Sequence, residues 1–295
     1  MPLAQILFSL LINLNPMPRY AYSLSLLALW FLLGCGGSGN TDTQDARPLR
    51  SPADLAPERE QHPFAAPLET AHGYAAWQDA DALRYELALR VGEKTLLAQV
   101  TMETDFSRIK LITDQRESLV WDEKHYYVSP ADVAWMQPRL DLFTWPFLTA
   151  APFKINDPGT QVDSLGERQL LDQRVEGIRL SFEADAIYPQ SEFQLYRSDS
   201  SNLLAGVVFS APYFAEDDSL YAMQPQAITF HLYSEFDGLQ MPTEWRFWAW
   251  DEEQGLGERL GTARLGKFKL IETDKLSYSV PFSHRTYHPQ GEPVD

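Results

Sequence analysis

The sequence of 295 residues contains a single cysteine, Cys35. A lone cysteine cannot form an intramolecular disulfide bond, and free thiols are uncommon in exported proteins, so Cys35 needs a specific explanation. Basic residues are also scarce, because 24 Lys and Arg stand against 41 Asp and Glu, for a formal net charge of −17. An acidic surface repels phosphate groups, and we therefore expect neither nucleic acid nor anionic lipid headgroups as direct partners.

The chain also lacks a continuous apolar run of the roughly 20 residues that a membrane-spanning helix needs. Its longest nearly continuous run, Ala21 to Leu33, follows Arg19 and is followed by Gly34-Cys35-Gly36. A short basic region, an apolar stretch and small residues are typical of a signal peptide. Leu32-Leu33-Gly34-Cys35 resembles the cleavage box of bacterial lipoproteins, in which the cysteine is acylated and becomes the first residue of the mature chain. The resemblance implies that Cys35 carries lipid and that residues 1–34 are removed.

Two details refine this prediction. A second apolar stretch, Ile6 to Leu14, precedes a signal that is already complete from Met17, so we expect translation to start at Met17. A membrane span assembled from both apolar stretches is the alternative. In similar lipoproteins an Asp after the cysteine retains the protein in the inner membrane, and Gly36 at this place favours a periplasm-facing position on the outer membrane.

Residues 35–63 are rich in Gly, Ser, Pro and charged residues and have almost no large apolar side chain, which predicts a disordered tether behind the lipidated cysteine. The remaining chain, residues 64–295, is expected to form one domain. A helix is predicted over Ala65 to Trp77. After it, apolar and polar residues alternate in short segments, which predicts strands with one buried and one exposed face. The predicted strands cover residues 83–91, 95–102, 108–113, 118–121, 126–128, 175–182, 192–197, 203–210, 228–236, 244–250 and 261–271.

The strands are separated by turns and not by helices of crossover length, so the sheet is predicted to be an antiparallel meander. Asp237-Gly238 marks a hairpin turn, and Gly266 marks a bulge. Alternation places Phe230 and Leu232 on the buried face. The fold class expected from this pattern is mainly β.

One segment, Asp132 to Phe153, departs from the alternation because it combines many large apolar residues with three prolines. Proline disfavours a central strand and a long helix, so we predict one or two short helices that cover something apolar. If they form a lid over a cavity, the candidate ligand-binding residues are Trp135, Leu142, Phe143, Trp145 and Phe147. A permanent plug without a cavity explains the same residues equally well.

No catalytic group, metal site or cofactor site is predicted. Gly255-Leu256-Gly257 with Gly261 lacks the strand and helix of a dinucleotide loop, and we interpret it as a hairpin turn. His284 and His288 have metal-ligand spacing but lie between prolines, and Glu216-Asp217-Asp218 lacks the pattern of a calcium loop. His72, with Gly73 and Trp77, opens the domain in a way that resembles an uncharacterised family of envelope lipoproteins, and its role is left open.

The order of these features resembles the superfamily of lipoprotein-localisation carriers and their outer-membrane receptor. That resemblance implies an incomplete barrel with a helical lid that binds acyl chains in its cavity. We therefore expect a lipid-anchored protein that binds a lipid or another hydrophobic ligand. The alternative is an envelope scaffold or protein-interaction module with a filled core, whose partner the sequence does not identify. A hydrolase ranks third, because the chain lacks a Gly-x-Ser-x-Gly motif and its only thiol is assigned to the anchor.

The anchor is testable by the change Cys35→Ser. Stable attachment depends on buried acyl chains, so this change should abolish incorporation of labelled fatty acid and shift the protein from the membrane to the soluble fraction. Metabolic labelling and fractionation measure both effects. If the variant stays on the membrane, and neither the variant nor the parent chain incorporates the labelled fatty acid, the lipid anchor is excluded.

Overall fold

The computed structural model describes residues 61–182, 192–210, 225–272 and 276–294. The predicted signal peptide, Cys35 and nearly all of the expected tether lie outside these residues. Among the described residues, no helix is both long enough and apolar enough to cross a membrane.

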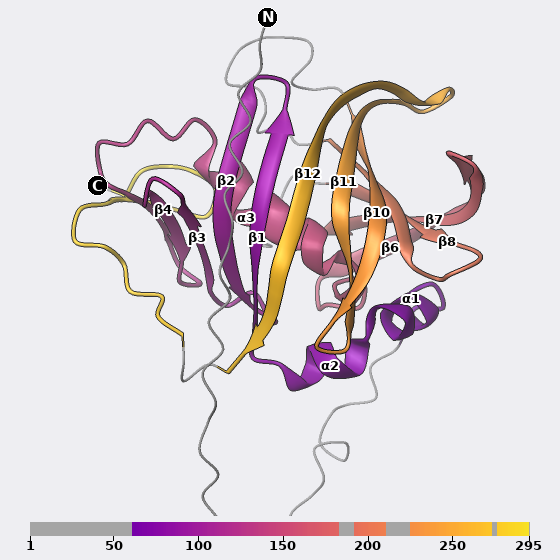
Figure 1. The fold of residues 1–295 in the computed structure, drawn as a ribbon, viewed down its shortest axis with the longest axis horizontal. Coiled ribbons are helices and arrows are strands. Elements are labelled where there is room, and N and C mark those ends of the chain that lie inside the picture. The colour runs from indigo at the N-terminus through magenta and orange to yellow at the C-terminus, as the bar shows by residue number, and fades with distance from the viewer. Residues whose placement is uncertain (1–60, 183–191, 211–224, 273–275, 295) are drawn as a thin grey trace, which may run out of the picture. The chain divides into compact units, whose positions relative to one another are not determined.

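Thirteen strands of the described chain form one antiparallel sheet in the order β13-β5-β4-β3-β2-β1-β12-β11-β10-β9-β8-β7-β6. Figure 1 shows the long strands β1, β2, β10, β11 and β12 curving together in front of the helix α3. The two strands at the ends of this order, β13 and β6, are not paired with each other, so the sheet is not closed. The mainly β fold predicted from the alternation and the incomplete barrel implied by the family resemblance are both confirmed. Its strands are β1 Ala82–Val91, β2 Lys94–Glu103, β3 Ile109–Thr113, β4 Ser118–Trp121, β5 Tyr126–Ser129, β6 Thr160–Leu170, β7 Gln173–Phe182, β8 Glu192–Ser198, β9 Leu204–Ser210, β10 Gln226–Phe236, β11 Leu239–Asp251, β12 Gly255–Ile271 and β13 Arg285–Tyr287.

The alternation of the sequence determines which face of the sheet is buried. In β1, Leu83, Leu87 and Leu89 are buried in the core, while Glu86 and Arg90 on the other face are exposed. We call the face that carries these leucines, and that packs on α3, the inner face, and the opposite one the outer face. The bulge predicted near Gly266 is present, because the pairing of β1 with β12 shifts between Arg84 and Glu86.

Leu232 corrects one prediction. Phe230 is buried as expected, but Leu232 is 62% exposed and has a φ of 54°. This left-handed backbone interrupts the period of two, and Tyr233 and Phe236 contact the core in its place. The Asp237-Gly238 turn that follows joins β10 to β11 as predicted, with both residues at positive φ.

Two strands were not predicted. β6 carries charged and small residues along most of its length, and its burial pattern is largely exposed, so no apolar period marks it. β13 has only three residues and is held by backbone pairing with β5. Both strands form because neighbouring backbone groups pair with them, which alternation of side chains does not reveal.

The predicted N-terminal helix is present as two helices, α1 Ala65–His72 and α2 Tyr74–Asp79. Gly73 separates them with a φ of 86°, a conformation that favours glycine. A Cβ atom at Gly73 would lie 2.0 Å from the carbonyl oxygen of Gly238 in the β10–β11 turn. Glycine therefore both ends α1 and lets it approach the sheet. The other helices are α3 Pro138–Ala150 and a 3-10 helix at Ala151–Phe153, which keeps the label η2.

His72 joins α1 to two strands. Its Nδ1 lies 2.9 Å from the carbonyl oxygen of Gln240 in β11, and the backbone N–H of Leu204 in β9 donates to its Nε2 at 3.0 Å. Because the carbonyl only accepts and the amide only donates, Nδ1 carries the proton and the ring is neutral. Burial lowers the pKa of His72 to about 4, although the hydrogen bond to Gln240 acts in the opposite direction. His72 is thus a structural residue, satisfied at both nitrogens.

His72 predicts a loss of stability in mild acid. The unfolded chain binds a proton at His72 below its ordinary pKa of about 6.5, whereas the folded chain does so only below about 4. The free energy of unfolding should therefore fall by about 3 kcal/mol as the pH drops through this window. Urea unfolding at several pH values measures it. His72→Gln keeps one donor and one acceptor without titrating, and an equally steep pH dependence in that variant would contradict the assignment.

Candidate functional site

Most of the segment with three prolines is helical, as the helix α3 with η2 after it. Pro138 occupies its first turn, where no backbone N–H is needed, and so favours the start of the helix there. Pro146 lies inside the helix, contrary to the expectation that it would break it. The lost backbone hydrogen bond costs free energy, and the burial of the surrounding apolar residues offsets it. Pro152 lies in η2, which continues from the end of α3.

All sides of α3 are buried, from Arg139 to Ala150. Its aromatic residues reach strands that are far apart in the sheet. Phe143 contacts Trp121 of β4 with ring centroids 5.3 Å apart, and Phe147 contacts Phe193 of β8 at 4.3 Å. The helix therefore crosses the inner face and fills most of it, as a plug does.

Asp141 is the one carboxylate on α3, and only 1% of its surface is exposed. Its Oδ1 accepts hydrogen bonds from the Nζ of Lys94 at 2.6 Å and the Nε1 of Trp145 at 2.7 Å, and its Oδ2 accepts one from the Nε1 of Trp135 at 2.9 Å. Lys94, at the start of β2, also donates to the side chain of Gln137 at 3.3 Å. A buried charge is tolerated when it is paired and hydrogen-bonded in this way. Asp141 thus fixes both indoles.

Space remains beside the N-terminal half of α3. A cavity of about 390 Å³ opens between α3 and the ends of β1, β11 and β12. Its volume is in the range of small-molecule sites, and much of its lining is apolar. The side chains of Leu89, Trp145 and Phe247 are buried there, while Met136 is 71% exposed. The complete lining consists of Leu89, Val91, Gly92, Lys94, Met136, Gln137, Trp145, Pro225, Gln226, Phe247, Ala249, Glu258 and Leu260.

A second hollow of about 440 Å³ adjoins this cavity, because Lys94, Met136 and Gln137 line both. Trp135 and Asp141 line only the second hollow. The short segment from Trp135 to Gln137 therefore separates two spaces, and the exposed Met136 borders each of them. A rearrangement of this segment would change access to the cavity without moving α3 out of the core.

The five predicted ligand-binding residues are distributed over three environments. Trp145 lines the 390 Å³ cavity, and Trp135 lines the adjoining hollow. Leu142, Phe143 and Phe147 are packed in the core and line neither space.

Sequence reasoning missed Lys94, Asp141 and the strand residues of the cavity. A single acid within an apolar helix was the available signal for Asp141. The strand residues carry no such signal, because Leu89, Phe247 and Leu260 look like any other core positions.

The remaining motifs that fall within the described residues do not assemble into a metal or cofactor site. Among the described residues, no group of three or more His, Cys, Asp or Glu side chains is placed to hold a metal ion. His288 lies near His125, with ring centroids 5.4 Å apart, and His284 instead faces Tyr127. Gly255 and Gly257 belong to β12, where Gly255 follows the turn from β11. Glu216-Asp217-Asp218 lies outside the described residues.

No protein-family model and no curated protein matches the sequence. Solved structures with a similar fold include a LolA superfamily protein from Nitrosomonas europaea, with 10% identity and a TM-score of 0.42 over 68% of this chain and 94% of that one. An outer membrane lipoprotein-sorting protein domain from Vibrio parahaemolyticus has 11% identity and a TM-score of 0.41, with the same coverage. The lipoprotein LppX from Mycobacterium tuberculosis has 10% identity and a TM-score of 0.24 over 72% of this chain and 98% of that one. These names agree with the resemblance stated from the sequence, but such distant likeness transfers no ligand or partner to this chain.

The role of Asp141 can be tested by Asp141→Asn. The Asn side chain has an NH2 group in place of one of the two carboxylate oxygens, and this group cannot accept a hydrogen bond. Either Trp135 therefore loses its acceptor, or Lys94 and Trp145 lose theirs. We expect the free energy of unfolding to fall by about 2 kcal/mol, the cost of an unsatisfied buried polar group. Urea unfolding followed by tryptophan fluorescence measures it. Glu192→Gln, in the exposed ion pair with Arg179, is the matched control and should change stability little. Equal effects of the two changes would refute a special role for Asp141.

Proposed function

We propose that this protein is a lipid-anchored envelope protein that binds a lipid or another hydrophobic ligand in the cavity beside α3. The observation that carries the proposal is the cavity of about 390 Å³ lined by Trp145, Phe247 and Leu89. An apolar cavity is poorly hydrated, so an apolar ligand gains the free energy of leaving water when it enters.

The position of polar groups supports a ligand with one apolar part and one polar end. Lys94, Gln137 and Gln226 lie on the lining together with the apolar residues. The ammonium group of Lys94 already pairs with Asp141, and 24% of its side chain is exposed. An amphiphile could place its chain against Trp145 and Phe247 and keep its polar end near these groups. The chemical class of that end is left open.

The second candidate function is a scaffold or interaction module. It is favoured by α3 itself, which fills most of the inner face and is buried on every side. In that case the space beside α3 would be a packing defect that binds nothing. The anchor at Cys35 and the outer-membrane location are shared by both candidates and rest on the sequence.

The two candidates differ in the effect of filling the cavity. Ala249 of β11 lines the cavity, so Ala249→Trp should occupy part of it. Ala75 of α2 is exposed and lines neither the cavity nor the hollow on the outer face, so Ala75→Trp adds the same group away from both. Titration of the purified protein with a fluorescent fatty acid should show saturable binding that Ala249→Trp weakens by about tenfold and Ala75→Trp leaves unchanged. Absence of saturable binding across several lipid classes would leave the scaffold as the better explanation.

A further inference from the structure

The strands β1, β11 and β12 together carry a charge opposite to that of the whole protein. These three strands contain seven basic and four acidic residues, whereas the chain as a whole has a formal net charge of −17. The acids are Glu86, Glu244, Asp251 and Glu258, and the bases are Arg84, Arg90, Arg246, Arg259, Arg264, Lys267 and Lys269. Basic residues are therefore concentrated on the middle of the sheet, and averaging the charge over the chain conceals them.

Three of the cations on the outer face form a row. Arg84 lies directly opposite Lys269 in the pairing of β1 with β12. On its other side Arg84 pairs with Thr101, which in turn pairs with Lys110 of β3. Like charges at neighbouring cross-strand positions destabilise a sheet. None of these three cations forms an ion pair with a carboxylate of the described residues, so no direct ion pair offsets their mutual repulsion.

Two hydrogen bonds hold part of this row in place. The Nε of Arg84 donates to the hydroxyl of Thr101 at 3.1 Å, and the Nζ of Lys110 donates to the carbonyl oxygen of Ser277 at 3.1 Å. The pKa of Lys110 is lowered by partial burial and by the positive charge of Arg84. An anion that approached Arg84 and Lys110 would relieve that repulsion.

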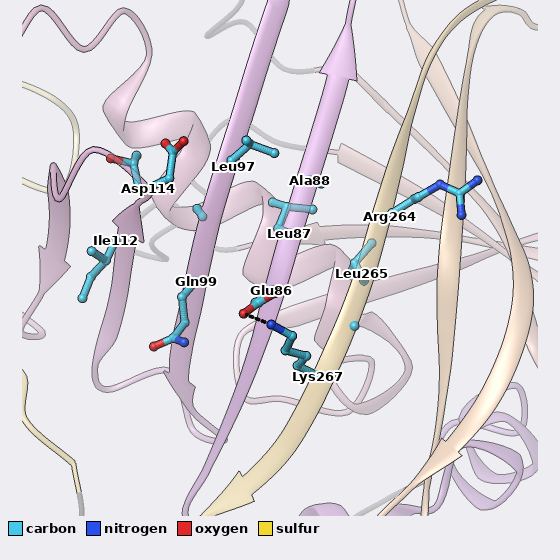
Figure 2. Close-up of a pocket in the computed structure, with 13 residues that line it drawn as sticks. Glu86, Leu87, Ala88, Leu97, Gln99, Ile112, Asp114, Arg264, Leu265 and Lys267 are labelled. Atoms are coloured by element: carbon cyan, nitrogen blue, oxygen red, sulfur yellow. Dashed lines mark hydrogen bonds and ion pairs between the residues drawn. The ribbon is translucent and has the colours of Figure 1, made fainter. Parts of the chain in front are cut away.

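A wide hollow lies beside the row. It has a volume of about 710 Å³ and extends across β3, β2, β1 and β12. Figure 2 shows Leu97 and Ile112 along it, with Arg264 and Lys267 at the side of β12 and the ion pair from Lys267 to Glu86. Leu97 is 46% exposed, and a Cβ atom at Gly266 would meet no atom within 4 Å. The hollow is thus open and partly apolar, and the charged residues that line it are Arg264, Lys267, Glu86 and Asp114.

We propose that this outer face docks onto an anionic bilayer surface. The positive charge attracts anionic headgroups, and the apolar hollow accepts aliphatic groups at the interface. A bilayer fits better than a folded acidic protein, because the cations of β12 are highly exposed and a fluid lipid surface needs no fixed spacing of its phosphates. This contact differs from ligand binding in the cavity, which lies on the inner face. It is also the opposite of what the net charge of the chain predicts, namely that anionic headgroups are not partners.

The test uses the full chain reconstituted in vesicles, with a thiol reporter in the hollow. Leu97→Cys places the reporter on the basic face, and Glu167→Cys on the exposed edge strand β6 serves as the control. Each reporter thiol is modified with an uncharged maleimide. The modification rate of the parent chain, whose single cysteine is Cys35, is subtracted. Vesicles of zwitterionic lipid alone are compared with vesicles that also contain phosphatidylglycerol.

We expect the anionic lipid to slow modification of the Leu97→Cys reporter by about tenfold and to leave the Glu167→Cys reporter unchanged, with the slowing lost at high salt. The triple change Arg264→Glu, Lys267→Glu and Lys269→Glu should also abolish it. The matched triple change Arg116→Glu, Lys124→Glu and Arg174→Glu alters the net charge equally at exposed sites elsewhere and should preserve it. Thermal unfolding checks that both triple variants fold.

Three outcomes would overturn the proposal. The first is an unchanged rate at the Leu97→Cys reporter in anionic vesicles. The second is slowing that survives reversal of the three β12 cations. The third is slowing in zwitterionic vesicles that grows with protein concentration, which would indicate that a second copy of the chain covers the face.

Discussion

The burial of α3 against the inner face is the constraint on which the rest of the structure depends. A helix of 13 residues that is apolar on nearly every side must be covered all around, and one flat layer of strands cannot do this. The sheet instead curves so that β4 on one side and β8 on the other contact the same helix through Phe143 and Phe147. Because the helix occupies the interior, the strands need not close into a barrel to exclude water.

The same constraint explains the position of the cavity beside Gln137 and Trp145. Towards its end, Phe147 packs on Phe193, and Thr149 donates a hydrogen bond to the hydroxyl of Tyr85. Near its start, the buried carboxylate of Asp141 draws Lys94 and the two indole N–H groups towards itself. With these polar atoms paired to one another, the wall that Trp145 presents to the cavity is apolar. A polar cluster thereby creates a hydrophobic site.

Alternation along single strands was enough to predict most of the sheet, since the period of two follows directly from one buried and one exposed face. Prediction failed where backbone geometry departed from that period, as at Leu232, or where pairing alone held a strand, as in β6 and β13. The apolar content of the segment around α3 predicted its burial, but proline rules did not predict that Pro146 would be tolerated within the helix. The strand residues that line the cavity could not be predicted, because Leu89, Phe247 and Leu260 meet only when β1, β11 and β12 become neighbours.

The two faces of the sheet also separate charges that the net charge adds together. In β1, Leu83, Leu87 and Leu89 point inward while Arg84, Glu86 and Arg90 point outward, so one strand contributes to the apolar core and to the basic face at once. The net charge of the chain does not record this separation. Electrostatic attraction, however, depends on the charges nearby, because it falls off within about 10 Å in salt solution. A bilayer next to the outer face would meet the cations of β1 and β12 at short range, whereas acidic residues elsewhere on the surface would be largely screened. The local pattern, and not the total of −17, therefore decides which surfaces this protein can approach.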